Sequence, residues 1–350
     1  CNFEHHRDGV LAILGCENDK QVVAEAIAKH DGRELEDRFN TAGLCTAFVR
    51  SPEEWLAGEQ AKAIAKLPLL EIEKIGDSPV EPLPEGSRPL SGVCVLDLTR
   101  VIAGPVGGRT LAEHGADVMR VTGHHLPGFP EGLDIDMGHG KLSAALDLRT
   151  PEGQARFGAL IEGADVFLQS YRPGSMASRG YSPEALAMRR PGIIYATLSA
   201  YGHVGPWRER RGFDSLTQSA SGIVFEESGG GPPRHLPAQA LDYVSGYLLA
   251  LGMMAALGRR ATEGGSYLVR VSLAQTGRWL QSIGRTPAED IANGALDLSY
   301  EGVRDLLTER DTDFGRLSFL APVVHMSETA PRWERPSVPL GSSPPVWPER

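Results

Sequence analysis

The 350-residue sequence has few of the residues from which metal sites and disulfide frameworks are built. Its four cysteines, at positions 1, 16, 45 and 94, form no C-x-x-C pair and no zinc-like spacing. The ten histidines likewise show no metal-binding spacing, so no metal is predicted. In a chain of this length, so few cysteines predict reduced thiols and a cytoplasmic location.

The sequence also lacks a block of basic residues, and its net charge is −10. This balance argues against a general nucleic-acid-binding protein, although a local cluster of donors would still suit an anionic ligand. There is no visible signal peptide and no uninterrupted run of 18 apolar residues. The longest apolar stretch is bounded by Asp242 and by Arg259, which predicts a buried core helix and not a membrane span.

Several catalytic templates are missing as well. The turn after the first predicted strand reads A-G-P-V-G-G, without the G-x-G-x-x-G of a nicotinamide site. The sequence contains no G-x-x-x-x-G-K-[ST] phosphate loop, no G-x-S-x-G nucleophile turn and no H-E-x-x-H. These absences leave nucleotide hydrolysis, serine hydrolysis and zinc proteolysis without support.

What is present is an alternation of short apolar runs with helical patterns. Helix starts are marked by Ser51, Thr150 and Ser182, and Gly163 marks a helix end. The alternation predicts an α/β fold with a Rossmann-like parallel sheet and helical crossovers. Its strands are predicted at residues 93–98, 117–121, 143–148, 165–170, 192–200 and 267–273. Ligands of such sheets bind beyond the carboxyl ends of the strands.

Changes in composition along the chain predict its domain organisation. A small α/β domain is expected over residues 1–80, followed by a linker rich in Pro, Gly and Ser at 81–92. The Rossmann-like domain spans 93–240. A long buried helix, a strand and a helix follow at 241–284, and a loop-rich tail at 285–350 is expected to pack along a surface.

Asp242 is the single carboxylate at the front of the apolar stretch QALDYVSGYLLALGMMAALG, residues 239–258. One interpretation is an N-cap, because a carboxylate accepts hydrogen bonds from the free N–H groups of the first helical turn. The other is a nucleophile held between apolar walls. Local sequence leaves both open. Arg100, Lys141, Arg172 and Arg211 lie beside the glycine-rich strand ends, where together they would suit a phosphate-bearing ligand.

The stretch VLDLTRVIAGPVGGRTLAEHGADVMRV resembles the opening of the family III CoA-transferases, which include carnitine and formyl-CoA transferases. The resemblance continues in order through HGKLSAALDLRTPEG, ADVFLQSYRPGSM and RGFDSLTQSASG, over about residues 90–275. It implies an enzyme that moves coenzyme A from an acyl-CoA to a carboxylate acceptor, with Asp242 as the covalent nucleophile. It also implies an interlocked homodimer or an intrachain pseudo-dimer.

The same resemblance implies which residues contact CoA. They are Val101, Ile102, Ala103, Leu146, Asp147, Leu148, Arg149, Ser170, Tyr171, Arg172 and Arg211. Two departures weaken the nucleotide contacts. Thr122 and Gly123 stand where the family often has a basic residue, and Arg179 lies one step later than the usual arginine.

Two alternatives remain on the same scaffold. Related racemases use a histidine where this chain has Phe213, which disfavours racemisation, but an isomerase would need only Asp242. A CoA-binding paralogue without catalysis is the non-enzymatic alternative. The front segment, ELEDRFNTAGLCTAFVRSPEEW, weakly resembles the family's small domain, which normally follows the Rossmann half. We therefore expect a rearranged or long-form member whose natural chain begins before Cys1.

Overall fold

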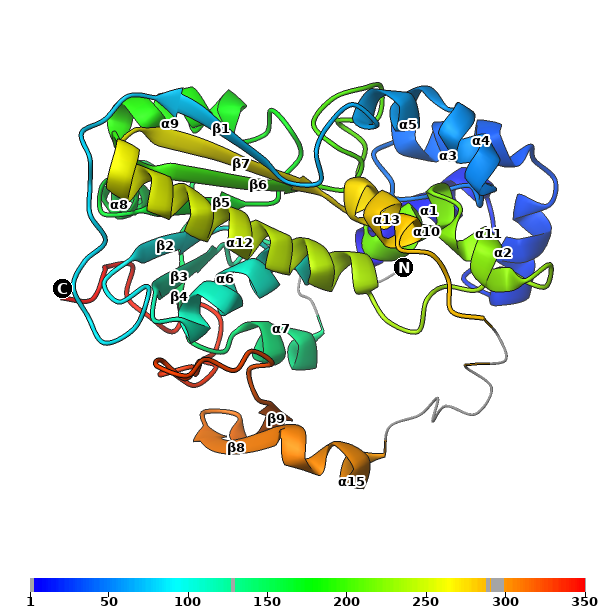
Figure 1. The fold of residues 1–350 in the computed structure, drawn as a ribbon. Helices are drawn as coiled ribbons and strands as arrows, with labels where there is room; N and C mark the ends of the chain where they lie inside the picture. The colour runs from blue at the N-terminus through cyan, green and yellow to red at the C-terminus, as the bar shows by residue number, and fades with distance from the viewer. Residues whose placement is uncertain (1–2, 127–129, 288–289, 291–298, 350) are drawn as a thin grey trace.

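The computed structural model describes residues 3–126, 130–287, 290 and 299–349. A seven-stranded sheet with strand order β1-β7-β6-β5-β2-β3-β4 organises the chain (Figure 1). All neighbouring strands are parallel except β1 and β7, which are antiparallel. The strands are β1 (Glu71–Gly76), β2 (Cys94–Asp97), β3 (Asp117–Thr122), β4 (Lys141–Ala145), β5 (Val166–Gln169), β6 (Ile194–Ser199) and β7 (Ser266–Ser272). The predicted α/β fold is confirmed.

The sheet is buried on both faces, which explains why its central strands read as continuous apolar runs. Successive side chains of a strand point to opposite faces, so each strand contributes to two separate cores. Val95 of β2 packs in the core on one face and Leu96 packs in the core on the other. Each fully buried Leu or Val side chain contributes about 2 kcal/mol through removal of apolar surface from water.

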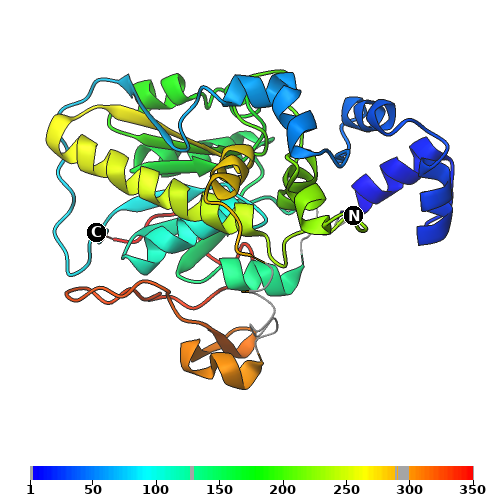
Figure 2. The same ribbon diagram turned by 45° about the vertical axis from the view of Figure 1, so that its right-hand side comes forward.

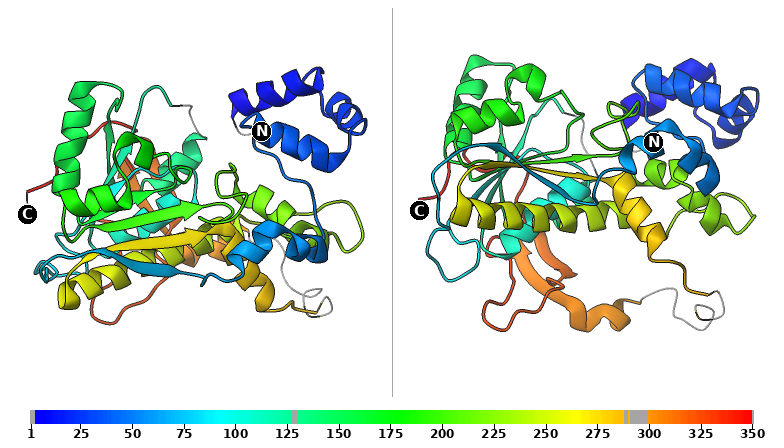
Figure 3. Two further views of the ribbon diagram at one scale, coloured as in Figure 1. Left: turned by 90° about the horizontal axis from the view of Figure 1, so that it is seen from above. Right: turned by 45° about the horizontal axis from the view of Figure 1, so that its top comes forward.

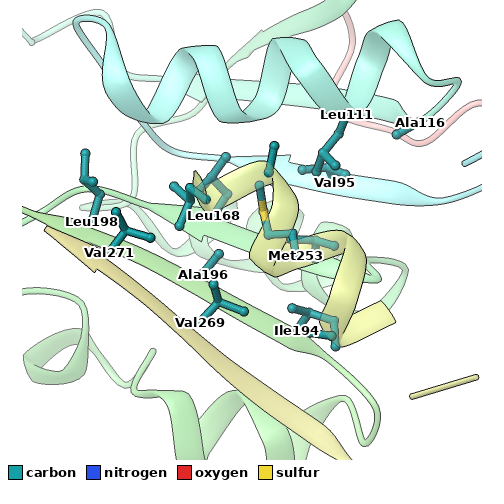
Figure 4. Close-up of a cluster of buried hydrophobic side chains, with 14 of the residues drawn as sticks. Val95, Leu111, Ala116, Leu168, Ile194, Ala196, Leu198, Met253, Val269 and Val271 are labelled. Atoms are coloured by element: carbon teal, nitrogen blue, oxygen red, sulfur yellow. The ribbon is translucent and has the colours of Figure 1, made fainter. Parts of the chain in front are cut away.

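Helices cover both faces of the sheet. On one face lie α6 (Ala103–Glu113) and α12 (Ala240–Glu263), where Met253 packs with side chains of β2, β5, β6 and β7 (Figure 4). On the other face lie α8 (Pro151–Glu162) and α9 (Pro183–Arg189), and Figure 3 shows the sheet between the two helical layers. The predicted caps are confirmed, because the side chains of Thr150 and Ser182 accept hydrogen bonds from the first turns of α8 and α9.

The helices α6 and α12 are packed at unusually close range. A Cβ atom added to Gly246 would lie 2.6 Å from the Ala103 carbonyl oxygen and 2.6 Å from the Val106 Cβ. Only glycine permits this approach. The contact joins the second turn of α12 to the first turn of α6, and it thereby fixes Asp242 beside the turn that follows β2.

By length and composition alone, α12 is apolar enough to cross a membrane. However, 56% of its most apolar window is buried inside the protein, against α6 and the sheet. The expectation that this stretch forms a core helix is therefore confirmed by its packing.

The front of the chain forms a helical unit beside the carboxyl ends of the parallel strands (Figure 2). Its helices are α1 (Glu4–Leu14), α2 (Lys20–Ile27), α3 (Gly32–Thr41), α4 (Pro52–Ala57) and α5 (Glu59–Ile64). Ser51 caps α4 in a capping box with Glu54, as its sequence predicts. The strand β1 also falls within residues 1–80, but it pairs with β7 in the main sheet. The division of the chain into five segments stays a prediction.

Short helices connect these layers, and a small hairpin follows them. The connecting elements are α7 (Glu131–Met137), η1 (Ala177–Arg179), α10 (Asp214–Ala220), α11 (Ile223–Ser228) and α13 (Leu273–Ser282). The tail contains α15 (Tyr300–Val303), η2 (Arg304–Leu306) and an antiparallel pair of strands, β8 (Leu307–Thr312) and β9 (Gly315–Leu320). Residues 288–289, 291–298 and 350 of the predicted loop-rich tail lie outside the described residues.

Two tryptophans fasten the tail to the body of the protein. The indole N–H of Trp333 donates to the Arg109 carbonyl on α6, at 3.0 Å, and that of Trp347 donates to the Leu160 carbonyl on α8, at 2.9 Å. These two bonds hold the tail against the body of the protein, and the tail carries a hairpin that its sequence pattern did not suggest. Cys16 and Cys45 are free thiols, and Cys1 lies outside the described residues.

Candidate functional site

A cavity of about 420 Å³ opens at the carboxyl ends of the parallel strands, beside the starts of α6 and α12. The loops after β2 and β5 form one part of its wall, and the front helical unit forms another. Asp242 lines the same cavity from the first turn of α12. The residues that line the cavity include Phe3, His5, His6, Cys45, Arg100, Val101, Ile102, Ala103, Ser170, Tyr171, Arg172, Arg210, Arg211, Phe213 and Asp242.

Asp242 is not the N-cap of its helix. The helix begins at Ala240 with Gln239 at the cap position, and that cap makes no side-chain hydrogen bond. The role falls instead to Asp214 of α10, whose Oδ2 accepts a hydrogen bond from the Asp242 backbone N–H at 2.9 Å. The capping interpretation of Asp242 is therefore wrong, because a carboxylate from another helix already satisfies this backbone group.

A hydrogen-bonded chain holds Asp214 in place. The Gln218 side-chain amide donates to Asp214 Oδ1, and Gln218 Oε1 accepts from the Leu236 N–H at 2.9 Å. Asp214 itself is 1% exposed. With Asp214 at the helix start, the Asp242 carboxylate is left for other chemistry, and no hydrogen bond to it occurs among the residues that the structure describes.

Burial makes the Asp242 carboxyl group unusually basic. The residue is 6% exposed, and loss of hydration raises its pKa to about 8, with the nearby Asp214 carboxylate as the second cause. Burial also raises the pKa of Asp214 above its ordinary value. Two carboxyl groups in one dry environment with shifted pKa values are typical of a functional site.

The turn after β2 is held in a strained conformation. Val101 has φ +74°, a left-handed value that costs a β-branched residue roughly 1–2 kcal/mol. A buried network fixes this turn, since Lys141 Nζ lies 2.8 Å from both Asp97 Oδ2 and the Pro105 carbonyl oxygen. Asp97 Oδ1 in turn accepts from Thr99 N at 2.8 Å. Lys141 therefore supports the turn and is not available to a ligand.

The loop after β5 is anchored in a similar way. Gln169 Oε1 accepts from the Tyr171 N–H at 2.6 Å, and the Gln169 amide donates to Thr197 Oγ1 at 2.6 Å. These bonds tie Ser170 and Tyr171 to strand β6. Both anchored loops face the same cavity, so the site is built on the rigid edge of the sheet.

Four arginines line the cavity although the chain as a whole is acidic. Arg100 lies over the Phe3 ring, 5.9 Å from its centroid, and burial lowers the pKa of Arg100. Arg210 pairs with Asp37 at 2.5 Å and stacks on Trp207. Arg172 is exposed and Arg211 is half-buried. Together they make the cavity suitable for an anionic ligand such as a phosphate ester.

The front helical unit supplies a wall that sequence reasoning did not predict. Phe3 stacks on Phe213 with ring centroids 6.0 Å apart, and His6 Nε2 lies 3.5 Å from Cys45 Sγ. No motif marks these residues, because a short helix and a loop reach the cavity only through tertiary packing. The adjacent histidines, His5 and His6, were the one visible signal, and such pairs are common on surfaces.

The structure brings together most of the residues that sequence reasoning selected. Asp242, Val101, Ile102, Ala103, Ser170, Tyr171, Arg172 and Arg211 line one cavity. The segment from Leu146 to Arg149 does not line it. Leu146 is buried, and Asp147 forms an ion pair with Arg149 at 2.7 Å at the surface after β4. This pairing lowers the pKa of Asp147.

Comparison with known proteins gives these observations a context. A sequence model of the family described as CoA-transferase family III matches residues 90–296, which is more than half of the chain. This range contains the sheet from β2 onward, both strand-end loops and Asp242. It excludes the front helical unit, including His6 and Cys45.

Individual relatives agree with the family match. An acyl-CoA transferase of Gibberella moniliformis is 35% identical over 75% of this chain and 51% of its own length. The probable fatty acyl-CoA transferase Rv3272 of Mycobacterium tuberculosis is 34% identical over 57% of this chain and 54% of its own length. A crystal structure of Rv3272 superposes with a TM-score of 0.53 at 32% identity, covering 57% of this chain and 58% of that one. The chain thus spans about half the length of the curated relatives it matches.

Proposed function

Because the chain belongs to CoA-transferase family III, we propose that it transfers coenzyme A from an acyl-CoA to a free carboxylate acceptor through a covalent intermediate on Asp242. The observation that carries this proposal is the state of Asp242. Its carboxyl group is buried at a ligand cavity with a raised pKa, and Asp214 takes over the capping role that would otherwise explain its position.

The proposed reaction begins when an Asp242 carboxylate oxygen attacks the thioester carbonyl carbon. The carbon–sulfur bond breaks, which leaves a mixed anhydride on Asp242 and a CoA thiolate. The thiolate then attacks the aspartyl carbonyl, releasing the first acid and forming an aspartyl-CoA thioester. The acceptor carboxylate repeats both steps in reverse, and Asp242 is regenerated. Each half of the reaction consists of two acyl transfers, one to a carboxylate and one to the CoA thiolate, so one difficult direct exchange becomes four easier steps.

The surroundings of Asp242 suit this chemistry. A poorly hydrated carboxylate with a pKa of about 8 is a better nucleophile than one in water, once it has lost its proton. The N–H of Asp242 is engaged by Asp214, so the start of α12 is not a free donor at that position. The start of α6, where Ile102 and Ala103 line the cavity, offers backbone N–H groups to the developing negative charge.

We assign the CoA moiety to the strand-end loops. Val101, Ile102 and Ala103 border the pantetheine arm, and Ser170, Tyr171 and Arg172 border the phosphates, which also fall near Arg100. The segment Leu146 to Arg149 follows β4, which lies two strands away from β2 in the sheet. At the carboxyl end of β4 the segment would border the adenine. The length of CoA is what would link this segment to the cavity, which it does not line itself.

Mass spectrometry of the purified protein after incubation with a set of acyl-CoAs tests the covalent step. We expect a CoA adduct on Asp242, and a hydroxamate at the same residue after a hydroxylamine quench. Asp242→Asn should give neither product and should leave CoA binding measurable. An exchange of CoA between acids that persists in Asp242→Asn would contradict the proposal. Isomerisation of an acyl-CoA without any transfer would contradict it as well.

An interlocked homodimer or pseudo-dimer and a cytoplasmic location remain part of the proposal. Side chains of α12 and α13 that face away from the core, including Tyr247, Leu251 and Trp279, are substantially exposed. Exposed apolar side chains gathered on neighbouring helices support an interface with a second copy or with further parts of the protein. Sedimentation of the natural protein at several concentrations tests this assembly.

A further inference from the structure

We propose that His6 is a phosphate ligand of coenzyme A, which the front helical unit supplies to an arginine-rich corner of the cavity. Arg100, Arg172 and Arg211 line this corner together with His6. The inference rests on the proposed function, because it takes coenzyme A as the occupant of the cavity. It adds a binding residue that no family motif marks, since the family match begins only at residue 90.

The corner collects positive charge from three separate loops. Arg100 follows β2, Arg172 follows β5 and Arg211 lies between β6 and α10. Among the residues that the structure describes, no carboxylate forms an ion pair with Arg172 or Arg211, although the chain carries a net charge of −10. Cations gathered in a cavity without protein counter-charges favour a ligand with several negative charges, such as a phosphate ester.

Two buried nitrogen atoms of the corner have no hydrogen-bond partner in the described part of the chain. They are Nδ1 of His6, a residue that is 6% exposed, and Nε of Arg211. Buried polar atoms are almost always paired in folded proteins, so such atoms in a cavity wall indicate a missing ligand. A phosphate group has several acceptor oxygens and would pair both atoms at once.

The surroundings of the imidazole make Nδ1 a hydrogen-bond donor. Burial, followed by the charges of His5 and Arg211, lowers the pKa of His6, so its imidazole is neutral near pH 7. Burial raises the pKa of Cys45 to about 11, so the thiol keeps its proton and donates to His6 Nε2, 3.5 Å away. A neutral imidazole that accepts at Nε2 carries its proton at Nδ1. His6 therefore presents an N–H group to the cavity.

The packing of the front helical unit holds His6 at the phosphate end of the cavity. Phe3, just before α1, stacks on Phe213, and the Arg100 guanidinium lies over the Phe3 ring. Arg172 belongs to the loop after β5, which the proposed function already gives to the phosphates. A phosphate in this corner would join α1 to the strand-end loops of the sheet, two parts of the chain that lie side by side in Figure 2.

Calorimetry with free coenzyme A and with 3′-dephospho-coenzyme A, under reducing conditions, tests the assignment without turnover. His6→Leu removes the donor and should weaken the binding of coenzyme A about 10- to 100-fold, as for a lost hydrogen bond to a charged group. His6→Asn, whose amide replaces the Nδ1 donor, should recover most of this loss. Equal weakening of both ligands in His6→Leu assigns His6 to the pyrophosphate. Weakening of coenzyme A alone assigns it to the 3′-phosphate.

The melting temperature of the ligand-free protein separates a binding role from a structural one. Because Nδ1 has no protein partner, His6→Leu removes a buried donor that is unpaired without ligand. The melting temperature should therefore stay the same or rise while the affinity for coenzyme A falls. His30→Leu is the matched control, because it makes the same substitution at an exposed position after α2. It should keep the wild-type affinity for both ligands.

Undiminished binding of both ligands by His6→Leu would overturn the inference. A loss of affinity that His6→Asn does not recover, together with a lower melting temperature, would overturn it as well, since His6 would then support the fold of the corner. Failure of the proposed function is read separately. A protein whose affinity for coenzyme A depends on His6, but which forms no adduct on Asp242, would retain this inference and lose the covalent step.

Discussion

The raised pKa of Asp242 predicts that this residue destabilises the folded protein as the pH increases. The unfolded chain loses the Asp242 proton near the ordinary pKa of 3.8, whereas the folded protein keeps it up to about 8. Between these values the folded state holds one proton more than the unfolded state. The free energy of unfolding therefore falls by about 1.4 kcal/mol per pH unit in this window. The contribution is fully present below the lower pKa and lost above the upper one.

The substitution Asp242→Asn removes this titration with almost no change in shape. At low pH we expect the variant and the wild-type protein to have the same free energy of unfolding. As the pH rises, we expect the variant to become increasingly more stable than the wild-type protein. From about pH 5 to about pH 7.5 the difference should grow by about 3 kcal/mol. For 350 residues the unfolding entropy is roughly 0.7 kcal/mol per degree, so the melting temperatures should diverge by about 4 °C.

Thermal unfolding of both proteins at a series of pH values measures this divergence. Asp147→Asn is a suitable control, because its carboxyl group is at the surface and Arg149 holds its pKa below the ordinary range. That control should follow the wild-type curve across the whole window. A difference in melting temperature between Asp242→Asn and wild type that stays constant from pH 5 to 7.5 would refute the assigned burial of the carboxylate. The mutant's gain in stability would accompany its loss of CoA transfer, a trade-off typical of active sites.

Two further predictions concern the support of Asp242. Gly246→Ala should destabilise the protein by about 1–3 kcal/mol and reduce CoA transfer, because the added Cβ would meet the Ala103 carbonyl oxygen. Gly258→Ala is the control on the same helix, where a Cβ meets open space, and it should stabilise the protein by about 0.5–1 kcal/mol. Denaturant titrations measure both changes. Asp214→Asn keeps an oxygen for the Asp242 N–H but removes the charge that raises the pKa of Asp242, so the acidic limb of the transfer rate should move to lower pH. If the acidic limb of the pH–rate profile does not shift in Asp214→Asn, burial alone accounts for the raised pKa of Asp242.

Much of the fold follows from local sequence signals. Thr150, Pro151 and Gly163 mark both ends of α8, and the apolar runs mark the buried parallel strands. The strand β1 was not predicted because it is a half-exposed edge strand, and its residues EIEKIG include three charged side chains. Its place in the sheet depends on pairing with β7, almost 200 residues later.

The candidate site could be predicted only in part for the same reason. The strand-end loops and Asp242 lie in one continuous resemblance, so sequence alone selected them. The correct cap was hidden, since Asp214 lies 28 residues before Asp242 and nothing local links them. His6 and Cys45 reach the cavity from a separate helical unit, and only packing against Phe213 and its neighbours brings them there.

This long-range wall has a consequence for how the protein folds. Phe3 packs on Phe213, which lies about 200 residues later in the chain. Contacts of such separation form late, because the entropy of closing the long loop is lost before the contact contributes favourable free energy. A refolding chain will therefore assemble the parallel strands from β2 to β7, with Asp242 already at their ends, before Phe3 packs on Phe213 and while the cavity is still open to water. We expect the far-ultraviolet circular dichroism signal to recover before the cavity closes and excludes water from Asp242. The rise in the pKa of Asp242 would then report the last step of folding.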